Sequence, residues 1–288
     1  MKYKKIIFLF SVFLPVSVVL RTMQLSFTVD YSTGFFTREF KTNGEAMLWV
    51  IFALCFAPAV FALFSHRNPE APPKPNIVLS VASFLAAGSV AYELFTERFS
   101  QAVMDWQVMA VKTAGVVTVA FFAYYGLQRF INFRIPRIST AIPTVYFILR
   151  IICDFTSISS LALISENLLL MISYCAILLF MLQFTKLYND IDSEYNFRKL
   201  LSTGLASIIL CFTHTVPHFI LKLSTGYSYM HTSFAANINV FFIGVFIAVF
   251  LFSHFSFSNA CLSEQEREEQ RFAFKEKISK ICKKIKQK

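Results

Sequence analysis

Residues 235–255 read AANINVFFIGVFIAVFLFSHF, an apolar stretch that contains no Asp, Glu, Lys or Arg. A helix needs roughly 20 apolar residues to cross the hydrocarbon core of a bilayer, and this stretch is long enough. Its apolar residues form an unbroken run, unlike the alternating or 3.6-residue patterns of half-buried elements in soluble proteins. The stretch therefore predicts a membrane span. Seven further segments qualify in the same way: 6–27, 46–64, 76–95, 107–127, 141–163, 167–187 and 200–222.

The composition of the 288-residue chain points to the same class of protein. Hydrophobic residues make up 56% of the chain and charged residues only 15%, whereas a soluble domain carries about 25% charged residues. This balance excludes a soluble globular protein, a disordered chain and a disulfide scaffold, and the apolar runs do not alternate as in a β-barrel. We expect an all-α, polytopic transmembrane helical bundle of about eight spans in residues 1–258, followed by a basic tail, 259–288.

Two features of the predicted spans need interpretation. Spans 141–163 and 167–187 are separated by Ser165-Glu166-Asn167, which predicts a very short turn and hence a tight antiparallel hairpin. The first span follows a lysine-rich start, as a secretory signal does, but no small-residue cleavage site comes after it. We therefore expect the first span to be an uncleaved signal anchor.

The Lys and Arg residues predict the orientation of the bundle, because positively charged loops stay in the cytoplasm. Most of the 27 Lys and Arg lie on the side that holds the N-terminus and the tail. Both termini are therefore predicted to be cytoplasmic, and a bacterial plasma membrane is the simplest compartment. The only tryptophans, Trp49 and Trp106, then fall at the outer ends of their helices, where aromatic belts occur. The net charge of +10 reflects this topology, so no nucleic-acid partner is expected.

The cysteines indicate neither a disulfide framework nor a metal site. Cys55, Cys153, Cys175 and Cys211 lie inside predicted spans, and no C-x-x-C spacing occurs in the chain. No cofactor and no metal are predicted. No feature of the sequence indicates the oligomeric state.

The tail carries the pattern of a basic amphipathic helix. Residues 263–266 form a capping box, and Phe274, Ile278, Ile281 and Ile285 recur on one helix face. Lysines fill the end of the segment. Three interpretations remain open: binding to anionic lipids of the inner leaflet, docking on a cytoplasmic protein, or a solvated helix that only enforces orientation.

The longest exterior loop, 28–44, contains a turn followed by two aromatic residues: Asp30, Gly34, Phe35 and Phe36. This pattern fits an aromatic anchor at the interface or a lid over an outward-facing pocket. Together with Arg21, Gln24 and Leu25, the loop resembles a pattern in uncharacterised multi-span membrane proteins of low-GC Gram-positive bacteria. The resemblance covers about sixteen residues, 21–36, and implies no activity.

Ionisable side chains inside the predicted spans are the strongest functional pointers. An Arg or Asp at the centre of a membrane helix costs about 2.5–3.5 kcal/mol, so such residues face a cavity or a partner. Arg150 and Asp154 lie four residues apart in the fifth span and share one helix face. They fit a substrate or ion pathway, or a structural pair that orients neighbouring helices.

The seventh span carries His214 and His218, also four residues apart, with Pro217 between them. Such a pair fits proton or substrate handling, or packing through hydrogen bonds to Ser and Thr, better than a metal site, because no third ligand accompanies it. Glu93 and Lys112 lie at similar depth in the third and fourth spans, which predicts an ion pair between these helices.

The preferred function is binding or transport of a small polar solute or proton through a site that comprises Arg150, Asp154, His214 and His218. A sensor or scaffold without transport activity is the first alternative, and a membrane enzyme acting on a lipid-linked substrate is the second. The chain contains no G-x-S-x-G, no glycine-rich phosphate loop and no H-E-x-x-H. An enzyme is therefore the least favoured of the three.

Overall fold

The computed structural model describes residues 3–30, 33–64, 76–96, 103–131, 136–157, 165–189, 191, 193–225 and 233–253. Within these residues the protein is all-α, and eight helices are long and apolar enough to cross a membrane. Two short 3-10 helices, η1 (Arg38–Phe40) and η2 (Arg137–Ala141), precede α2 and α5. The long helices are α1 (Tyr3–Thr28), α2 (Lys41–Leu63), α3 (Ile77–Thr96), α4 (Asp105–Leu127), α5 (Ile142–Ser157), α6 (Ser165–Tyr188), α7 (Ser193–Thr225) and an eighth helix, Phe234–Ser253.

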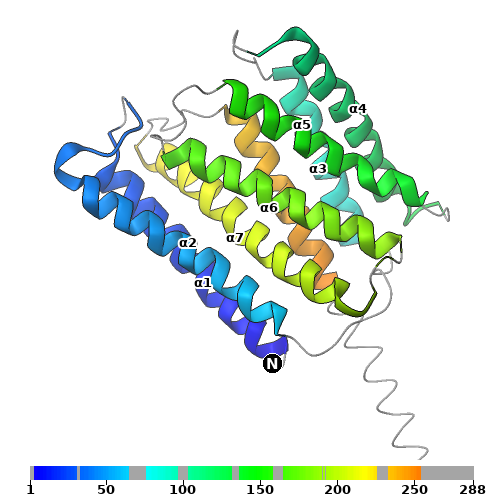
Figure 1. Ribbon diagram of the computed structural model, residues 1–288, viewed down its shortest axis with the longest axis horizontal. Helices are drawn as coiled ribbons and strands as arrows, with labels where there is room; N and C mark the ends of the chain where they lie inside the picture. The colour runs from blue at the N-terminus through cyan, green and yellow to red at the C-terminus, as the bar shows by residue number, and fades with distance from the viewer. Residues whose placement is uncertain are drawn as a thin grey trace, which may run out of the picture.

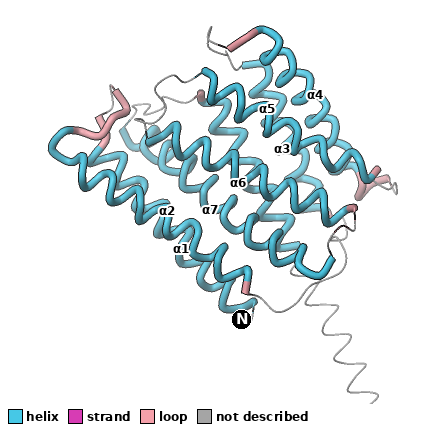
Figure 2. Tube along the Cα trace, in the orientation of Figure 1, coloured by secondary structure: helices cyan, strands magenta, loops and turns pink. Residues whose placement is uncertain are grey.

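The helices lie side by side and alternate in direction, so the loops gather at the two ends of the bundle (Figure 1; Figure 2). α1 and α2 pack against each other and against α7, whereas α4 packs against α3 and α5. α6 contacts both α5 and α7 and therefore lies between them. The most hydrophobic window of α7 is 78% buried, compared with 22% for α1, so α7 is a central helix and α1 a peripheral one.

Aromatic rings fill the core where the eighth helix, orange in Figure 1, meets α4 and α6. Phe246 lies 5.1 Å from Phe122, and Phe250 lies 5.1 Å from Phe184, between ring centroids, in edge-on geometry. Such edge-to-face pairs are favoured by the quadrupoles of the rings and add to the free energy gained from burial. The high phenylalanine content therefore serves internal packing as well as contact with lipid.

The helix boundaries differ from the sequence predictions at several points. α2 begins at Lys41 instead of residue 46, and α7 begins at Ser193 instead of residue 200. Ser165-Glu166-Asn167 is wrongly predicted as a turn, because these residues form the first turn of α6. The end of the predicted span 141–163 and the predicted tail, 259–288, lie outside the described residues.

Pro217 does not interrupt α7, which continues to Thr225. A proline inside a helix removes one backbone hydrogen bond, but neighbouring helices and Ser or Thr side chains accommodate this within a membrane bundle. The Thr215 hydroxyl donates to the Cys211 carbonyl at 2.8 Å, one turn before. The two histidines on either side of the proline therefore stay on one continuous helix.

Candidate functional site

Four helices contribute to a buried polar cluster around Glu93 of α3. The Glu93 carboxylate lies 3.2 Å from Arg150 Nη1, and Arg150 Nε donates to Asp154 Oδ2 at 3.0 Å. Tyr146 donates its hydroxyl to Glu93 Oε2 at 3.0 Å. The whole set, called the Glu93 cluster below, comprises Glu93, Tyr146, Arg150, Asp154, Tyr174 and Asn239, the last two of which also donate to Glu93.

The Glu93 cluster is closed to solvent and well supplied with partners. Glu93 is 0% exposed, Arg150 2% and Asp154 7%. The Arg150 guanidinium also lies 5.9 Å from the centre of the Tyr174 ring. No buried side-chain nitrogen or oxygen of the cluster lacks a hydrogen-bond partner within the part of the chain that the structure describes. Removal of one charge from such a group leaves the opposite charge buried, which is strongly destabilising.

The predicted pair of Glu93 and Lys112 is wrong. Glu93 faces the interior and binds Arg150, whereas the Lys112 side chain is exposed on the outer wall of α4. Depth along the membrane, which can be predicted from the sequence for both residues, does not specify which face of a helix carries a side chain. The rotation of α3 and α4 about their own axes decides the outcome.

A second cluster lies where α1, α6 and α7 meet. Arg21 Nη1 donates to Gln24 Oε1 and, at 3.4 Å, to Ser165 Oγ. Glu166 Oε1 lies 3.5 Å from His218 Nε2 and is within electrostatic reach of Arg21. The His214 and His218 rings are 5.6 Å apart, between centroids. The Arg21 cluster, as we call it, comprises Arg21, Gln24, Ser165, Glu166, His214 and His218.

The Arg21 cluster differs from the first in having donors that are not used. Arg21 and His214 are both 0% exposed. Among the described residues, Arg21 Nε and Nη2 and both ring nitrogens of His214 have no hydrogen-bond partner of regular geometry, although Asn237 lies beside His214. Nε and Nη2 form one edge of the guanidinium, which matches the two oxygens of a carboxylate or phosphate. Unsatisfied buried donors are rare and indicate a strained or functional position.

Both clusters lie toward the same end of the bundle. Arg21 and Glu93 are near the C-terminal ends of α1 and α3, and Glu166 is in the first turn of α6, which runs in the opposite direction. This end holds the loop that joins α1 to α2 (Figure 1). The four residues predicted as one site thus divide between the two clusters, since Arg150 and Asp154 belong to the Glu93 cluster and the histidines to the Arg21 cluster.

The structure adds three charged residues that the sequence did not assign to a site. Arg21 lies inside the predicted span 6–27 but close to its outer end, where an arginine side chain ordinarily extends to water, so it was not assigned to a site. In the structure it lies within α1 and is 0% exposed. Glu166 was predicted to lie in a turn, and Glu93 was predicted to pair with Lys112. The burial of Arg21 results from contacts of α1 with α6 and α7, which the sequence alone does not specify.

The described residues of the loop after α1 form a hydrogen-bonded turn that is linked to the Arg21 cluster through Gly44. Gly34 adopts a positive φ of 74°, and Val29 pairs with Phe36 in an antiparallel bridge. Phe36 packs so closely on Gly44 that a Cβ there would lie 2.5 Å from its ring. Gln24 Nε2 in turn donates to the Gly44 carbonyl at 2.6 Å.

The other two residues predicted for this loop have different positions. The Asp30 carboxylate accepts a hydrogen bond from Thr33 at 3.1 Å within the turn. The Phe35 side chain is 38% exposed, whereas Phe36 packs against the buried side chains of Leu25, Val29 and Leu221. Phe36 therefore anchors the loop, and Phe35 is the aromatic side chain of the pair left at the surface.

The geometry defines the class of the protein: an integral, polytopic helical membrane protein with a buried network of polar and charged side chains. Within the described residues, no group of three or more His, Cys, Asp and Glu could hold a metal ion. No family model matches the chain, and comparisons with curated proteins and with solved structures give no match either. The resemblance noted over residues 21–36 stays a prediction.

Proposed function

We propose that the protein binds a small anionic solute in the Arg21 cluster and moves it across the membrane. The observation that carries the proposal is the open edge of the Arg21 guanidinium, whose Nε and Nη2 have no partner among the described residues. A buried arginine binds a planar anion through two parallel hydrogen bonds, and burial strengthens them. The two ring nitrogens of His214 also have no hydrogen-bond partner of regular geometry among the described residues, so His214 offers a further donor from α7.

The charges of the Arg21 cluster support uptake of a proton together with the solute. Arg21 and Glu166 balance each other when both histidines are neutral, so an incoming anion leaves one negative charge in excess. A buried excess charge is costly, and protonation of a nearby group removes it. His218, whose Nε2 lies 3.5 Å from Glu166, is the nearest histidine to the carboxylate and the proposed proton acceptor.

The orientation predicted from the basic loops is part of the proposal. A cytoplasmic N-terminus leaves the Arg21 cluster in the outer half of the membrane, close to the loop that joins α1 to α2. A solute would then enter from outside and bind between helices, as in transporters whose sites lie among discontinuous or unusual helix segments. Pro217, on α7 between the two histidines, marks the point where that helix lacks a backbone hydrogen bond.

The first test measures anion binding by the whole protein in lipid nanodiscs. Inorganic phosphate and acetate are the probes, with chloride at equal ionic strength as the reference. We expect one of the two probes to raise the thermal midpoint of the wild type and to leave that of Arg21→Lys nearly unchanged. Lysine keeps the charge but lacks the two parallel N–H donors of the guanidinium edge. The proposal is overturned if neither probe exceeds chloride, or if Arg21→Lys responds as the wild type does.

The second test measures movement of the stabilising anion into proteoliposomes. We expect uptake to increase with an inward proton gradient and to fall in His214→Ala, while Asp154→Asn, if it folds, retains uptake. Binding without uptake would reject transport and keep a binding role.

A sensor is the second candidate, and one specific linkage favours it. Gln24 contacts Arg21 and also the Gly44 carbonyl, and Gly44 supports the Phe36 ring of the exterior loop. Occupancy of the Arg21 edge could thus change the loop without any solute crossing the membrane. Hydrogen exchange of residues 29–37 that slows with bound anion, in the absence of proteoliposome uptake, would favour the sensor.

A further inference from the structure

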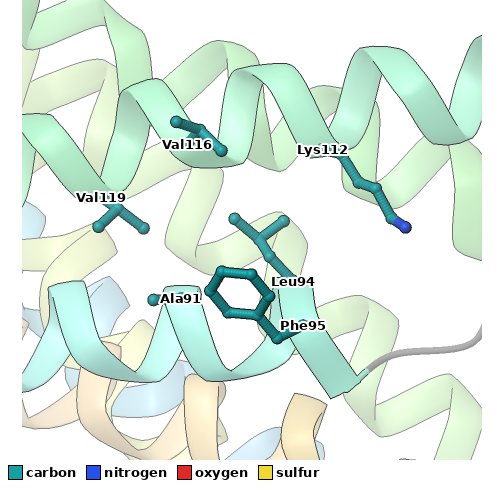
Figure 3. A pocket seen from close by; sticks show the side chains of 6 residues that line it. All are labelled: Ala91, Leu94, Phe95, Lys112, Val116 and Val119. Atoms are coloured by element: carbon teal, nitrogen blue, oxygen red, sulfur yellow. The ribbon is translucent and has the colours of Figure 1, made fainter.

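A groove of about 350 Å³ lies on the outer wall of the bundle between α3 and α4 (Figure 3). Lys112 stands at one end of it, toward the C-terminal end of α3, and the rest of the lining is apolar. Its volume is in the range of ligand pockets in proteins. The lining residues are Ala91, Leu94 and Phe95 of α3 and Lys112, Val116 and Val119 of α4.

The groove faces the region that lipid occupies in a membrane-spanning bundle. Phe95 is 90% exposed and Val116 63% exposed, although both belong to helices apolar enough to span the bilayer. Leu94 forms the floor, because Gly115 has no side chain and lets Leu94 approach within 2.5 Å of the position that a Cβ would take. Beneath the groove, α3 and α4 therefore approach each other closely.

Lys112 is a cation in an unfavourable position on this wall. It lies seven residues after Asp105, the start of α4, which corresponds to about 10 Å along the helix axis. The structure gives its ammonium no hydrogen bond or ion pair with any described residue, and its side chain is exposed. A lysine at this depth extends toward the headgroup region, where phosphate is the available anion.

We propose that the groove binds one anionic phospholipid, with its phosphate on Lys112 and one acyl chain along Val116 and Val119. The charge of the lysine is complemented by the single net charge of such a lipid, whereas a zwitterionic lipid brings a competing ammonium. Asp105 lies two turns nearer the surface on the same helix face, at the water interface, where solvent screens its charge. Trp106, 63% exposed beside it, is an interfacial anchor of the kind found at headgroup depth.

The proposed lipid site is independent of the anion site described above. Glu93, the neighbour of Leu94 in sequence, points into the bundle and is 0% exposed, so the wall of α3 separates the groove from the Glu93 cluster. The groove residues belong to α3 and α4, and the Arg21 cluster belongs to α1, α6 and α7. Loss of either site therefore leaves the other testable.

Native mass spectrometry of the whole protein, released from nanodiscs with equal phosphatidylglycerol and phosphatidylethanolamine, tests the proposal. We expect the wild type to retain one phosphatidylglycerol, and Lys112→Gln to lower that retention by about fivefold. Val116→Phe, which fills the groove and keeps the lysine, should lower it as well. Lys112→Arg should preserve retention, because it keeps the charge.

Lys222→Gln is the matched control. Lys222 lies in the last turn of α7 at the same end of the bundle but outside the groove, with its Nζ 4.5 Å from the centre of the Phe234 ring. We expect its retention of lipid to equal that of the wild type. The proposal is overturned if Lys112→Gln and Lys222→Gln retain equal lipid, if phosphatidylethanolamine is retained equally well, or if Val116→Phe has no effect.

Discussion

The Glu93 cluster and the Arg21 cluster are both buried, both contain an arginine with acidic neighbours, and both lie toward the same end of the bundle. They differ in how completely their hydrogen bonds are made. Glu93 accepts from three side chains besides its ion pair with Arg150, whereas Arg21 leaves one edge of its guanidinium unused among the described residues. A satisfied network holds helices in place, whereas buried donors without a partner indicate a strained or functional position.

The difference explains why buried charge alone is a poor guide to function in this protein. Arg150 and Asp154 stand out in the sequence because they are isolated in an apolar run, yet the structure pairs Arg150 with both Asp154 and Glu93 of α3 and places it beside the Tyr174 ring of α6. A buried ion pair of this kind costs desolvation energy and contributes specificity of packing more than stability. The pair therefore fits a role in fastening α3, α5, α6 and the eighth helix together.

The largest expected effect comes from breaking the Glu93 cluster. Arg150→Gln leaves Glu93 and Asp154 without their cation, and we expect it to reduce the free energy of unfolding by about 3–5 kcal/mol. The measurement is the thermal midpoint in nanodiscs, with the yield of monodisperse protein as a second readout. The double variant Glu93→Gln with Arg150→Gln removes the charges of Glu93 and Arg150 and leaves only that of Asp154, so it should recover part of the loss. Wild-type stability of Arg150→Gln would contradict the fastening role.

The eight helices were predictable because each carries an apolar run of sufficient length, and this property needs no knowledge of neighbours. The ends were less predictable. α2 starts five residues before its apolar run, with an exposed first turn in which Lys41 and Glu45 lie 4.0 Å apart. Polar residues at a helix end look like loop in a hydropathy pattern, so Glu166, in the first turn of α6, was predicted to lie in a turn.

The partners of the predicted site residues depend on which helices are in contact, and a single sequence does not contain this information. The i, i+4 spacing correctly places Arg150 with Asp154 and His214 with His218, since one helix is enough to bring such residues together. The expectation that both pairs lie near one another required α5 beside α7, but α6 lies between them. Their shared function therefore remains a prediction.

The second prediction concerns the open edge of Arg21. Arg21→Lys is expected to weaken binding of the stabilising anion by at least about tenfold, or about 1.4 kcal/mol, while most of the stability of the fold is kept. The anion concentration that half-maximally raises the thermal midpoint reports the affinity. If Arg150→Lys, where it folds, weakens anion binding as much as Arg21→Lys does, the two clusters do not differ as described.

The third prediction concerns the pH dependence of anion binding to the Arg21 cluster. If anion binding to the Arg21 cluster takes up one proton, the dissociation constant should rise as the pH is raised from about 6 to about 8, approaching tenfold per pH unit. His218→Gln should flatten this dependence, because the residue next to Glu166 no longer accepts the proton, and His214→Gln should keep it. An identical pH slope in the wild type and both variants would exclude the histidines as proton acceptors.

The smallest expected effect lies in the contact between the Arg21 cluster and the exterior loop. In Gly44→Ala the new Cβ meets the Phe36 ring, whose nearest atom is 2.5 Å from that position, so the ring has to move. We expect a loss of about 1 kcal/mol in stability and faster hydrogen exchange in residues 29–37. Anion affinity should fall less than in Arg21→Lys, because Gln24 still reaches the Gly44 carbonyl.

The double variant Gly44→Ala with Phe36→Leu separates this contact from a general disturbance of α2. A smaller side chain at residue 36 makes room for the added methyl group, so the double variant should return the exchange rate of the loop toward that of the wild type. If Gly44→Ala leaves the hydrogen exchange of the loop and the affinity for the anion unchanged, the linkage from Arg21 through Gln24 to the loop has no role in function. The Arg21 cluster would then act as a binding site alone, and the sensor candidate would lose its only structural support.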